Sequence, residues 1–600
     1  MNSKTILKNN RAAGLIILTI GLLLTGQMIT GHGVVGADSV FHYNRFYETY
    51  SQLKHLNFSW FQSIYGFNQS GRIVNVVYGP LFAYLNGDLL LLVHSWYQYQ
   101  LVSSIIIYLI GGFGMYQLLK RLSIRPIIAA MMASFYLTVG WMPRWQIGNN
   151  TTALGAMLMP YLLMITFDMI TFDMITDANR PIRWKKLALL MSLTIEIHLL
   201  SALLFMLVLI PAWLYALKIA NDKTQMLLDT VKAVFTAIVL TANTLVPLIY
   251  LSLTNHLAMP ADFDVIKNTL RLDSLNNTHT TITVFLLGIL ILQMMLAIVN
   301  WRHDRLNLIV TLLGAIFLGI SSQFFCWSII VSHFPIISRL LQFPVRLMML
   351  AYPLLIVGLA RSFETISSLP GKNRFFNQRR LSVGVLSVIW LVCLAQAGLF
   401  INQKARIGFM PRVLSSKTTS IGKNNNQNDQ RNVLKAMHAS DYQTFLKQLQ
   451  KRVPDYLATT KANVNAMQVA YSYGASVVDQ KSAIKIQAVS HGRLKLTWQA
   501  DGGEKIQLPI VTYHQSRLIV NSKNMTHFKR SLVGSPTIAQ KSGHNTAYLS
   551  YAAPLWLNAL IIISLLSWLA WALRTVVSHR YFKTYDHFVS KDELTVRSYP

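Results

Sequence analysis

An acidic side chain, followed at helical spacing by a histidine and an arginine, stands just beyond the first apolar run of the sequence. If the chain is helical from Ser39 onward, Asp38, His42 and Arg45 fall at positions i, i+4 and i+7, on one helix face. The carboxylate could take a proton from a hydroxyl group or bind a metal ion, and the arginine could hold a phosphate bidentately. Glu48, three residues further on, is another candidate. The alternative is that Asp38 caps a helix at the membrane surface and the others face water.

A second set of candidates lies in a short polar segment that contains Arg144, Asn149 and Asn150. Polar side chains beside Trp141 and Trp145 could line a sugar site. Tryptophan is also common where a membrane meets water, and this explains the two rings without a ligand.

Glu196 and His198 lie inside a long apolar run. Ionisable residues within membrane segments are usually functional. At i and i+2 these two cannot share one helix face unless the helix breaks between them. The alternative is a buried pair tied to backbone carbonyl groups.

The elements that must position these side chains are transmembrane helices. Of 600 residues, 53% are hydrophobic and 13% are charged, and the mean hydropathy is +0.38. Apolar runs must be helical in a bilayer, because lipid cannot satisfy free backbone groups, and about 20 residues cross it. We therefore predict an all-α polytopic membrane protein with about 12 transmembrane helices. The clearest runs are Ala12–Thr30, Leu101–Leu119, Ile127–Met142, Thr281–Val299, Leu308–Val331, Leu381–Ile401 and Leu555–Leu573.

Basic residues between the runs predict the orientation, because cytoplasmic loops are enriched in lysine and arginine. The N-terminus and the tail from Arg574 are both basic, so both termini should be cytoplasmic. Lys120 should also be cytoplasmic, which requires an even number of crossings before it and makes Tyr78–His94 a short, non-spanning or broken helix. The run Leu187–Leu217 is too long for one span, and we expect a tight helical pair that turns near His198.

The predicted organisation has four parts. Residues 1–401 form the transmembrane domain, with an outer loop at 31–77. Residues 402–552 form an extracytoplasmic domain, residues 553–573 the last transmembrane helix and residues 574–600 a cytoplasmic tail. Alternating segments such as Arg493–Trp498 predict short strands, so the outer domain should be α+β or β-sandwich-like. An asparagine-rich stretch at 422–429 is interpreted as a linker.

The formal net charge of +31 does not indicate nucleic-acid binding, because much of the basic excess lies between apolar runs and reports topology. In the outer domain, however, basic residues outnumber acidic ones by roughly three to one. This charge would attract an anionic envelope polymer, such as a teichoic acid, or lipid headgroups. Both cysteines, Cys326 and Cys393, lie in apolar runs, so no disulfide framework is expected for the outer domain.

Three motifs, in order, resemble a family of bacterial multi-spanning membrane proteins of the GT-C glycosyltransferase type, the 6-pyruvoyl-tetrahydropterin-synthase-related membrane proteins. Gly36–Arg45 is similar to the family's Gly-His-Asp-x-x-Phe-His-x-x-Arg signature. Arg339–Arg346 is similar to its Gln-Phe-Pro-Trp-Arg segment, and Val453–Leu457 is similar to its Asp-Tyr-Leu-Pro element. Ala37 and Val345 depart from the family pattern, where histidine and tryptophan stand.

The resemblance implies a GT-C-like membrane glycosyltransferase in the cytoplasmic membrane of a bacterium. Such an enzyme would transfer a sugar from a polyprenyl-phosphate donor to an envelope polymer or glycolipid on the outer face, with inversion of configuration at the anomeric carbon. Asp38 would be the general base and, if a divalent metal such as Mg²⁺ or Mn²⁺ takes part, a ligand of that metal. Arg45, Arg339 and Arg346 would hold the donor phosphate, with Gln342 and His42 positioning the substrate. For Arg339 and Arg346, simple contact with lipid headgroups is the alternative.

Two other classes of function stay open on the sequence. A transporter or flippase of a lipid-linked glycan would depend on acids within the spans, such as Glu196, and not on Asp38. A non-catalytic scaffold would bind envelope partners through residues 402–551 alone.

Overall fold

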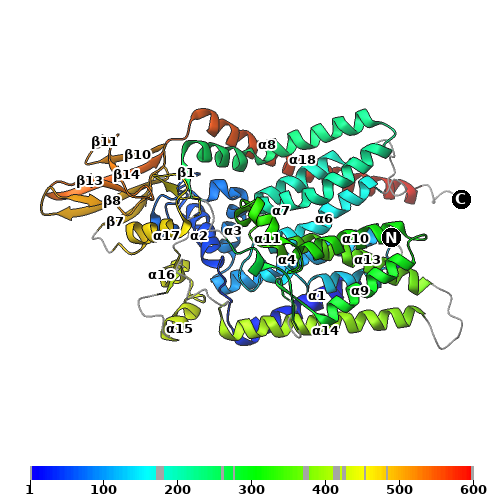
Figure 1. Ribbon diagram of the computed structural model, residues 1–600. Helices are drawn as coiled ribbons and strands as arrows, with labels where there is room; N and C mark the ends of the chain where they lie inside the picture. The colour runs from blue at the N-terminus through cyan, green and yellow to red at the C-terminus, as the bar shows by residue number, and fades with distance from the viewer. Residues whose placement is uncertain are drawn as a thin grey trace.

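The computed structural model describes residues 3–170, 182–258, 263–273, 278–368, 378–409, 419–421, 427–451, 455–480 and 484–595. The chain is a mostly helical, multi-pass membrane protein with a strand-containing C-terminal region. Figure 1 shows the helices gathered in one body and the strands at one end of it, with both chain ends toward the opposite end.

The helices that build the body and its loops are α1 (Ser3–Thr30), α2 (Ser39–His55), α3 (Pro80–Leu92), α4 (Trp96–Arg121), α5 (Pro126–Tyr136), α6 (Thr152–Ile170), α7 (Trp184–Ile219), α8 (Lys223–Thr254), α9 (Val284–Val299), α10 (Arg305–Ser321), α11 (Trp327–His333), α12 (Ile337–Leu340), α13 (Met348–Ser368), α14 (Gln378–Ile407) and α18 (Leu555–Thr595). The region between α14 and α18, which we call the outer region after its predicted location, adds α15 (Gln427–Ala436), α16 (Tyr442–Gln448) and α17 (Ala466–Tyr473).

Eight helices in the described ranges are long and apolar enough to cross a membrane. They are α1, α4, α6, α7, α8, α13 with the turn before it, α14 and the first part of α18. The other apolar helices α3, α5, α9 and α10 have 10–17 residues. Three expected spans correspond to these shorter helices, because the apolar run contains more than one element. The helix in Ile127–Met142 ends at Tyr136, Thr281–Val299 starts with strand β3 (Thr281–Thr283), and Leu308–Val331 divides into α10 and α11.

The interruption between α10 and α11 has a visible cause in the backbone. The amide of Leu270 donates to the carbonyl of Ser321 at 2.7 Å, and Gln323 donates back to Leu270 at 3.1 Å. A segment of the outer loop therefore takes the carbonyl at the end of α10 and stops the helix there.

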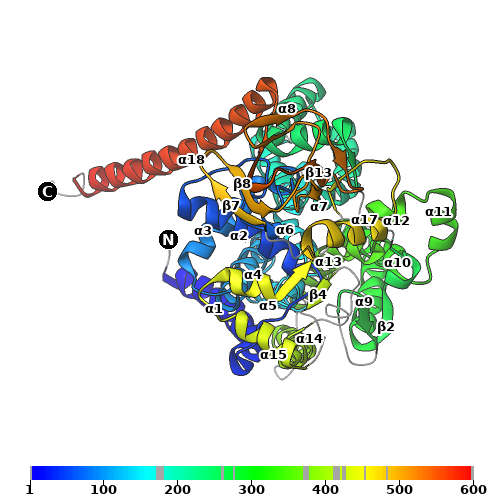
Figure 2. The ribbon, with the colours of Figure 1, turned by 90° about the vertical axis from the view of Figure 1, so that its left-hand side faces the viewer.

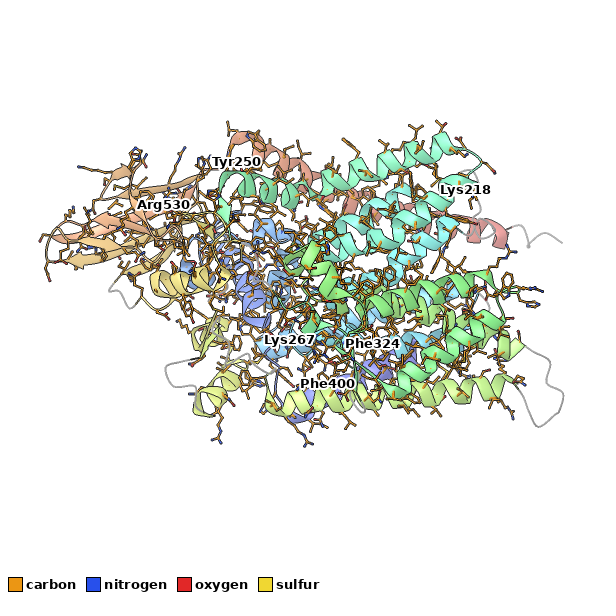
Figure 3. The ribbon with its side chains drawn as sticks, viewed as in Figure 1. Lys218, Tyr250, Lys267, Phe324, Phe400 and Arg530 are labelled. Carbon is orange, nitrogen blue, oxygen red and sulfur yellow. The ribbon has the colours of Figure 1, made fainter. Side chains whose placement is uncertain are left out.

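The turn expected near His198 is confirmed. His198 has φ −160° and ψ 94°, outside the helical region, although residues on both sides are helical. Arg183, just before α7, lies 3.7 Å from Asp168 at the far end of α6. At the other end of α7, Figure 3 places Lys218 far from the strands, whereas Tyr250, near the end of α8, lies next to them. Both ends of α7 therefore lie on the side away from the strands, and the chain folds back at His198.

The segment Tyr78–His94 forms the 13-residue helix α3, about 20 Å long and shorter than the apolar core of a bilayer. Its glycine, Gly87, packs on α2: a Cβ atom there would lie 2.6 Å from the Thr49 hydroxyl and 2.8 Å from the Tyr50 amide nitrogen. The close approach explains the glycine, and it holds α3 against the first outer helix.

Helix α13 is central in the body, with 94% of its apolar window buried, whereas α18 is peripheral, with 17% buried. Figure 2, which looks from the strand end, shows α18 reaching away from the other helices. Ion pairs join helix ends: Arg361 lies 2.7 Å from Asp304, which connects α13 to α10, and Arg125 lies 2.6 Å from Glu364, which connects α5 to α13.

The outer region contains two antiparallel sheets, as the alternating segments predicted. The five-stranded sheet has the order β11-β10-β14-β8-β7 and the three-stranded sheet has the order β12-β13-β9. Their bounds are β7 Lys485–Val489, β8 Arg493–Ala500, β9 Lys505–Gln507, β10 Ser516–Val520, β11 Lys523–Met525, β12 Lys529–Arg530, β13 Pro536–Ala539 and β14 Gly543–Tyr551. Both sheets contribute side chains to one apolar core, in which Leu496, Leu549 and Ile538 are buried.

The boundaries of this region differ from the expected ones at its start. Helix α14 continues to Ile407, beyond residue 401. Residues 422–426 of the expected linker lie outside the described residues, and α15 already begins at Gln427. The region also joins the body by strand pairing, because β1 (His256–Leu257), which follows α8, pairs with β6 (Ala458–Thr459). The remaining pairs are β2 (Arg271–Asp273) with β3, and β4 (Thr419–Ile421) with β5 (Leu449–Lys451).

Candidate functional site

Asp38 stands at the N-terminus of α2, as its position before a helix predicted. Its side chain does not cap the helix. The carboxylate turns instead toward the segment after α5, where Oδ2 accepts a hydrogen bond of 2.9 Å from Nδ2 of Asn150. Asp38 is half-buried, and its other oxygen, Oδ1, accepts no hydrogen bond from the described residues. One oxygen is thus held in place while the second stays open to a ligand.

A contact between two glycines brings these segments together. A Cβ atom on Gly36 would lie 2.3 Å from Cα of Gly148, so only glycine allows this approach. Next to it, Ser39 accepts from the Gly36 amide at 2.8 Å and donates to Oδ1 of Asn149 at 2.9 Å. Gly36, the first residue of the motif, therefore sets the distance between Asp38 and the segment that carries Asn150.

A network of hydrogen bonds between buried amide side chains holds Asn149 in place. Gln100 donates to Asn149 at 3.2 Å, Gln27 donates to Gln100 at 2.9 Å, and Gln146 donates to Gln27 at 2.9 Å. All four side chains have an exposed fraction of zero. Hydrogen bonds between buried amides favour a single arrangement, so the segment that meets Asp38 is held through Oδ1 of Asn149, while Nδ2 of Asn149 is buried without a hydrogen-bond partner.

Two arginines with buried, unpaired nitrogen atoms interact electrostatically with Asp38. Arg144 ends the turn η3 (Met142–Arg144), and its Nε and Nη1 are buried without a hydrogen-bond partner. Burial lowers the pKa of Arg144 to about 10, and the nearby Asp38 carboxylate raises it in part. Arg346, in the turn η6 (Pro344–Leu347), donates from Nη1 to the carbonyl of Leu341 at 2.7 Å, but its Nε is buried and unpaired. Arg346 also interacts electrostatically with Asp38.

Unpaired buried N–H groups of a guanidinium are costly, because each loses its hydrogen bonds to water without a replacement. Three such nitrogens, on two arginines that interact electrostatically with a carboxylate whose second oxygen is open, form a place where an anionic ligand would supply the missing acceptors. The Asp38 carboxylate does not supply these acceptors, since it forms no hydrogen bond with Arg144 or Arg346.

Two histidines and a tyrosine complete the surroundings. His198, at the turn of α7, lies within the electrostatic reach of Arg346, and Tyr78 interacts with both Arg346 and Asp38. His279 stacks edge-on against Trp141 with ring centroids 4.7 Å apart, and its Nδ1 is buried without a partner. Burial and the charge of Arg144 lower the pKa of His279 well below its ordinary value, so the ring is neutral at pH 7.

Arg45 and His42 lie deeper than the sequence suggested. Arg45 is fully buried and donates to Asn75 Oδ1 at 3.1 Å, to the carbonyl of Tyr78 at 2.5 Å and to the carbonyl of Gly79 at 3.3 Å. Its Nη1 lies 3.3 Å from Nδ1 of His42, which is also buried. Because the guanidinium of Arg45 donates its hydrogen bonds to acceptors within the protein, its structural role is to hold the segment before α3.

Glu48 organises a loop. Its two oxygens accept from the amides of Ile64, Tyr65 and Gly66 at 2.9, 2.8 and 2.6 Å, and from Gln52 Nε2 at 2.8 Å. Burial raises the pKa of Glu48 above its ordinary value, although these four hydrogen bonds act in the opposite direction. The visible role of Glu48 is structural.

Glu196 lies beside the segment that Arg45 holds. One of its oxygens accepts from Thr244 at 2.8 Å, and the other, Oε2, is buried without a partner. Gly79 packs on its backbone so closely that a Cβ atom would lie 1.7 Å from the Glu196 carbonyl oxygen, and the φ of Gly79 is +77°. The turn of α7 is therefore in contact with the outer loop.

Arg339 and Gln342 are not gathered at Asp38 in the same way as Arg346. Arg339 is exposed on the short helix α12, and Gln342 is half-buried with φ +60°. Of the third motif, Val453 and Pro454 lie outside the described residues. Tyr456 has its ring 5.9 Å from that of Tyr78, in an edge-to-face contact, so the third motif touches the segment before α3.

The donor set around Asp38 does not fit a divalent metal. Mg²⁺ and Mn²⁺ prefer several oxygen ligands with negative charge, whereas Asp38 has one amide and two guanidinium groups as neighbours. In the part of the chain that the structure describes, no three His, Cys, Asp or Glu side chains come together as a metal site.

Sequence reasoning ranked Arg144 low and missed His279. In the sequence, a position at the membrane surface explained Trp141 and Trp145 without a ligand, so the segment with Arg144 did not stand out as a site. The positions of Arg144 and His279 along the chain also have no regular spacing from Asp38. No protein-family model matches the chain, and no curated protein matches it. The chemistry of the site therefore rests on the side chains that meet there.

Proposed function

We propose that the protein is a membrane glycosyltransferase of the GT-C type, which moves a sugar from a polyprenyl-phosphate donor to an envelope polymer or glycolipid. The proposal is carried by two features of one region: an open carboxylate oxygen on Asp38, and buried N–H groups of Arg144 and Arg346 that have no hydrogen-bond partner. A base and an anion site side by side are what the transfer of a group from a phosphate to a hydroxyl requires.

The reaction would be a single displacement with inversion. As the acceptor hydroxyl oxygen bonds to the anomeric carbon, its proton passes to Oδ1 of Asp38. The bond from the anomeric carbon to the phosphate oxygen breaks, and the electron pair stays on the leaving polyprenyl phosphate. Arg144 and Arg346 would bind that growing negative charge, and Asn150 would keep Asp38 oriented. No step uses a metal.

This assignment changes the roles suggested by the family resemblance. Arg144 takes the place given to Arg45 as a phosphate ligand, because the N–H groups of Arg45 already bind the protein. Arg45 becomes a positioning residue for the segment at Tyr78. We further propose that the site faces the outside of a bacterial cytoplasmic membrane, with both termini in the cytoplasm, as the basic loops indicate.

The test is donor turnover by the full-length protein in lipid nanodiscs. Polyprenyl-phosphate hexose labelled in the sugar is mixed with extracted glycolipids and teichoic acids, and the label that leaves the donor is counted. We expect Asp38→Asn to lower the rate by about 10²- to 10⁴-fold. The matched control is Asp264→Asn, which changes an exposed acid elsewhere in the outer loops.

Three outcomes separate the alternatives. Loss of transfer in Asp38→Asn alone supports the enzyme. Movement of labelled donor across a bilayer that is blocked by Glu196→Gln but not by Asp38→Asn would instead indicate a transporter. No turnover or movement by the wild-type protein, with envelope polymers still bound, would leave the scaffold as the best account.

A further inference from the structure

A cleft of about 290 Å³ lies between the helical body and the outer region, apart from the Asp38 site. One wall comes from α2 and the loop after it, with Asn44, Tyr47 and Asn68. The other comes from α16 and the turn η7 (Gly474–Val478), with Gln443, Lys447 and Val478. The volume is close to the lower end of small-molecule sites, which begin at about 300 Å³.

Amides are the largest group of side chains in the lining, with aromatic and aliphatic surface between them. Of the ten lining residues four are asparagine or glutamine, two are tyrosine, three are leucine or valine, and one is the exposed Lys447; none is acidic. Each amide offers both a donor and an acceptor. Sugar rings present hydroxyl groups that donate and accept, and C–H faces that pack on aromatic rings. The lining is therefore complementary to a neutral sugar.

Two amides on opposite walls are available for such contacts. Asn68 is exposed on the first wall and Gln443 is half-buried on the second. Neither side-chain amide forms a hydrogen bond with any residue in the described ranges. A ligand in the cleft could therefore bind both without displacing a protein contact.

The wall that contains Asn68 is held in an unusual backbone conformation. Phe67, Asn68 and Gln69 all have positive φ, at +49°, +60° and +52°. Left-handed conformations in residues other than glycine cost free energy and persist where surrounding contacts enforce them. Here the Phe67 amide donates to Oδ1 of Asn44 at 2.8 Å, and Nε2 of Gln69 donates to the Ile64 carbonyl at 3.0 Å.

Glu48 completes this support, because its carboxylate binds three successive amides just before the same residues. The loop is thus fixed before any ligand arrives, which reduces the entropy lost on binding. It also gives the buried Glu48 a purpose that the Asp38 site does not use.

The second wall is fixed to the body as well. The indole nitrogen of Trp96 donates to the carbonyl of Tyr442 at the start of α16, at 3.0 Å. The ring of Phe445, one turn later, lies 5.6 Å from that of Tyr43 in α2. Since both walls are anchored to the same helices, the cleft is a formed site.

We propose that this cleft binds one neutral sugar unit of a glycan chain. If the proposed transferase activity holds, on which this second step rests, the bound unit belongs to the acceptor and the cleft keeps a growing or polymeric acceptor beside the membrane. The binding itself needs no donor and no transfer.

The test measures sugar binding by the full-length protein in nanodiscs without donor. Maltotetraose, chitotetraose and mannotetraose serve as probes, followed by saturation-transfer NMR and by calorimetric titration. Asn68→Gly removes the amide and keeps the positive φ easy to adopt, and Gln443→Ala removes the opposite amide. Matched controls are Asn463→Gly, another exposed asparagine with φ +53°, and Gln499→Ala on the exposed face of β8.

We expect at least one probe to bind, and each cleft variant to weaken it by about threefold to tenfold, the effect of one hydrogen bond. The controls should bind as the wild type does. Absence of binding by all three probes, or equal binding by cleft variants and controls, would overturn the proposal. Binding that survives while Asp38→Asn has no effect on turnover would refute Asp38 as the base of the proposed transferase and leave the cleft. Turnover that depends on Asp38 without any sugar binding would do the reverse.

Discussion

The contact between Gly36 and Gly148 gives the sharpest prediction, because it limits how closely the segment with the proposed base can approach the segment that orients it. In Gly36→Ala, the new Cβ would lie 2.3 Å from Cα and 2.6 Å from the carbonyl oxygen of Gly148. Both atoms belong to the backbone, so no flexible side chain can move aside. Alanine itself suits the backbone here, since the φ of Gly36 is not positive.

The magnitude follows from the space that is missing. An ordinary contact begins at 3.4 Å, so the two segments must separate by about 1 Å. The hydrogen bond from Asn150 to Asp38, now 2.9 Å, would stretch to nearly 4 Å and be lost. A 1 Å displacement of a catalytic group costs about 10²-fold in rate, or about 2.7 kcal/mol of barrier.

The assay is the initial rate of label transfer in nanodiscs at saturating donor, with size-exclusion profile and thermal unfolding measured on the same sample. Gly21→Ala in α1 is the matched control, because a Cβ at Gly21 would have no neighbour within 4 Å. Should Gly36→Ala fail to fold, Ser39→Ala tests the same coupling, since it removes the bond to Asn149 and adds no atom. A folded Gly36→Ala protein within threefold of the wild-type rate would refute this reasoning.

Three further predictions concern single side chains. Arg144→Gln should lower transfer by about 10²-fold, since it removes a donor from the leaving phosphate, whereas the exposed Arg271→Gln should not change it. Glu48→Gln should lower the free energy of unfolding by about 2–3 kcal/mol in chemical or thermal unfolding, because an amide nitrogen cannot accept from the backbone amides of the loop. The exposed Glu504→Gln is the control. No loss in Glu48→Gln, or an equal loss in Glu504→Gln, would contradict the structural role. The pKa of His279 is depressed in the folded state, so the unfolded chain binds a proton first as the pH falls through the ordinary value of 6.5, and the free energy of unfolding should decline there. Between pH 7.5 and 5.5 the melting temperature of His279→Gln should therefore fall less than that of the wild type. Parallel melting curves for the two proteins would show that the assignment is wrong.

The membrane class could be read from the sequence because the bilayer imposes it locally. An apolar run of sufficient length has only one way to satisfy its backbone in lipid, and each run carries that constraint by itself. The turn of α7 was also accessible, since His198 interrupts a run too long for one span. Strand alternation in residues 485–500 predicted β7 and β8 for the same reason, because side-chain period is a local property.

Helix ends within apolar runs could not be predicted from the sequence in this way. The stop after Ser321 depends on Leu270, about fifty residues earlier, which takes the carbonyl at the helix end. Nothing in the run Leu308–Val331 announces that partner. The eight helices whose length and composition suit a bilayer in the described ranges therefore do not confirm the predicted count of about 12 spans.

At the site, the residue pattern was enough to predict that a helix follows Asp38 and carries His42 and Arg45, because helical periodicity orders residues within one element. Only the tertiary structure decided that Arg45 is used up by internal carbonyls, and that Arg144 and Arg346 present unpaired N–H groups near Asp38. Those partners come from segments separated by about a hundred residues or more. Which of them meet is decided by the packing of whole helices, and by the glycine contact that lets two loops approach, so no spacing along the chain encodes it.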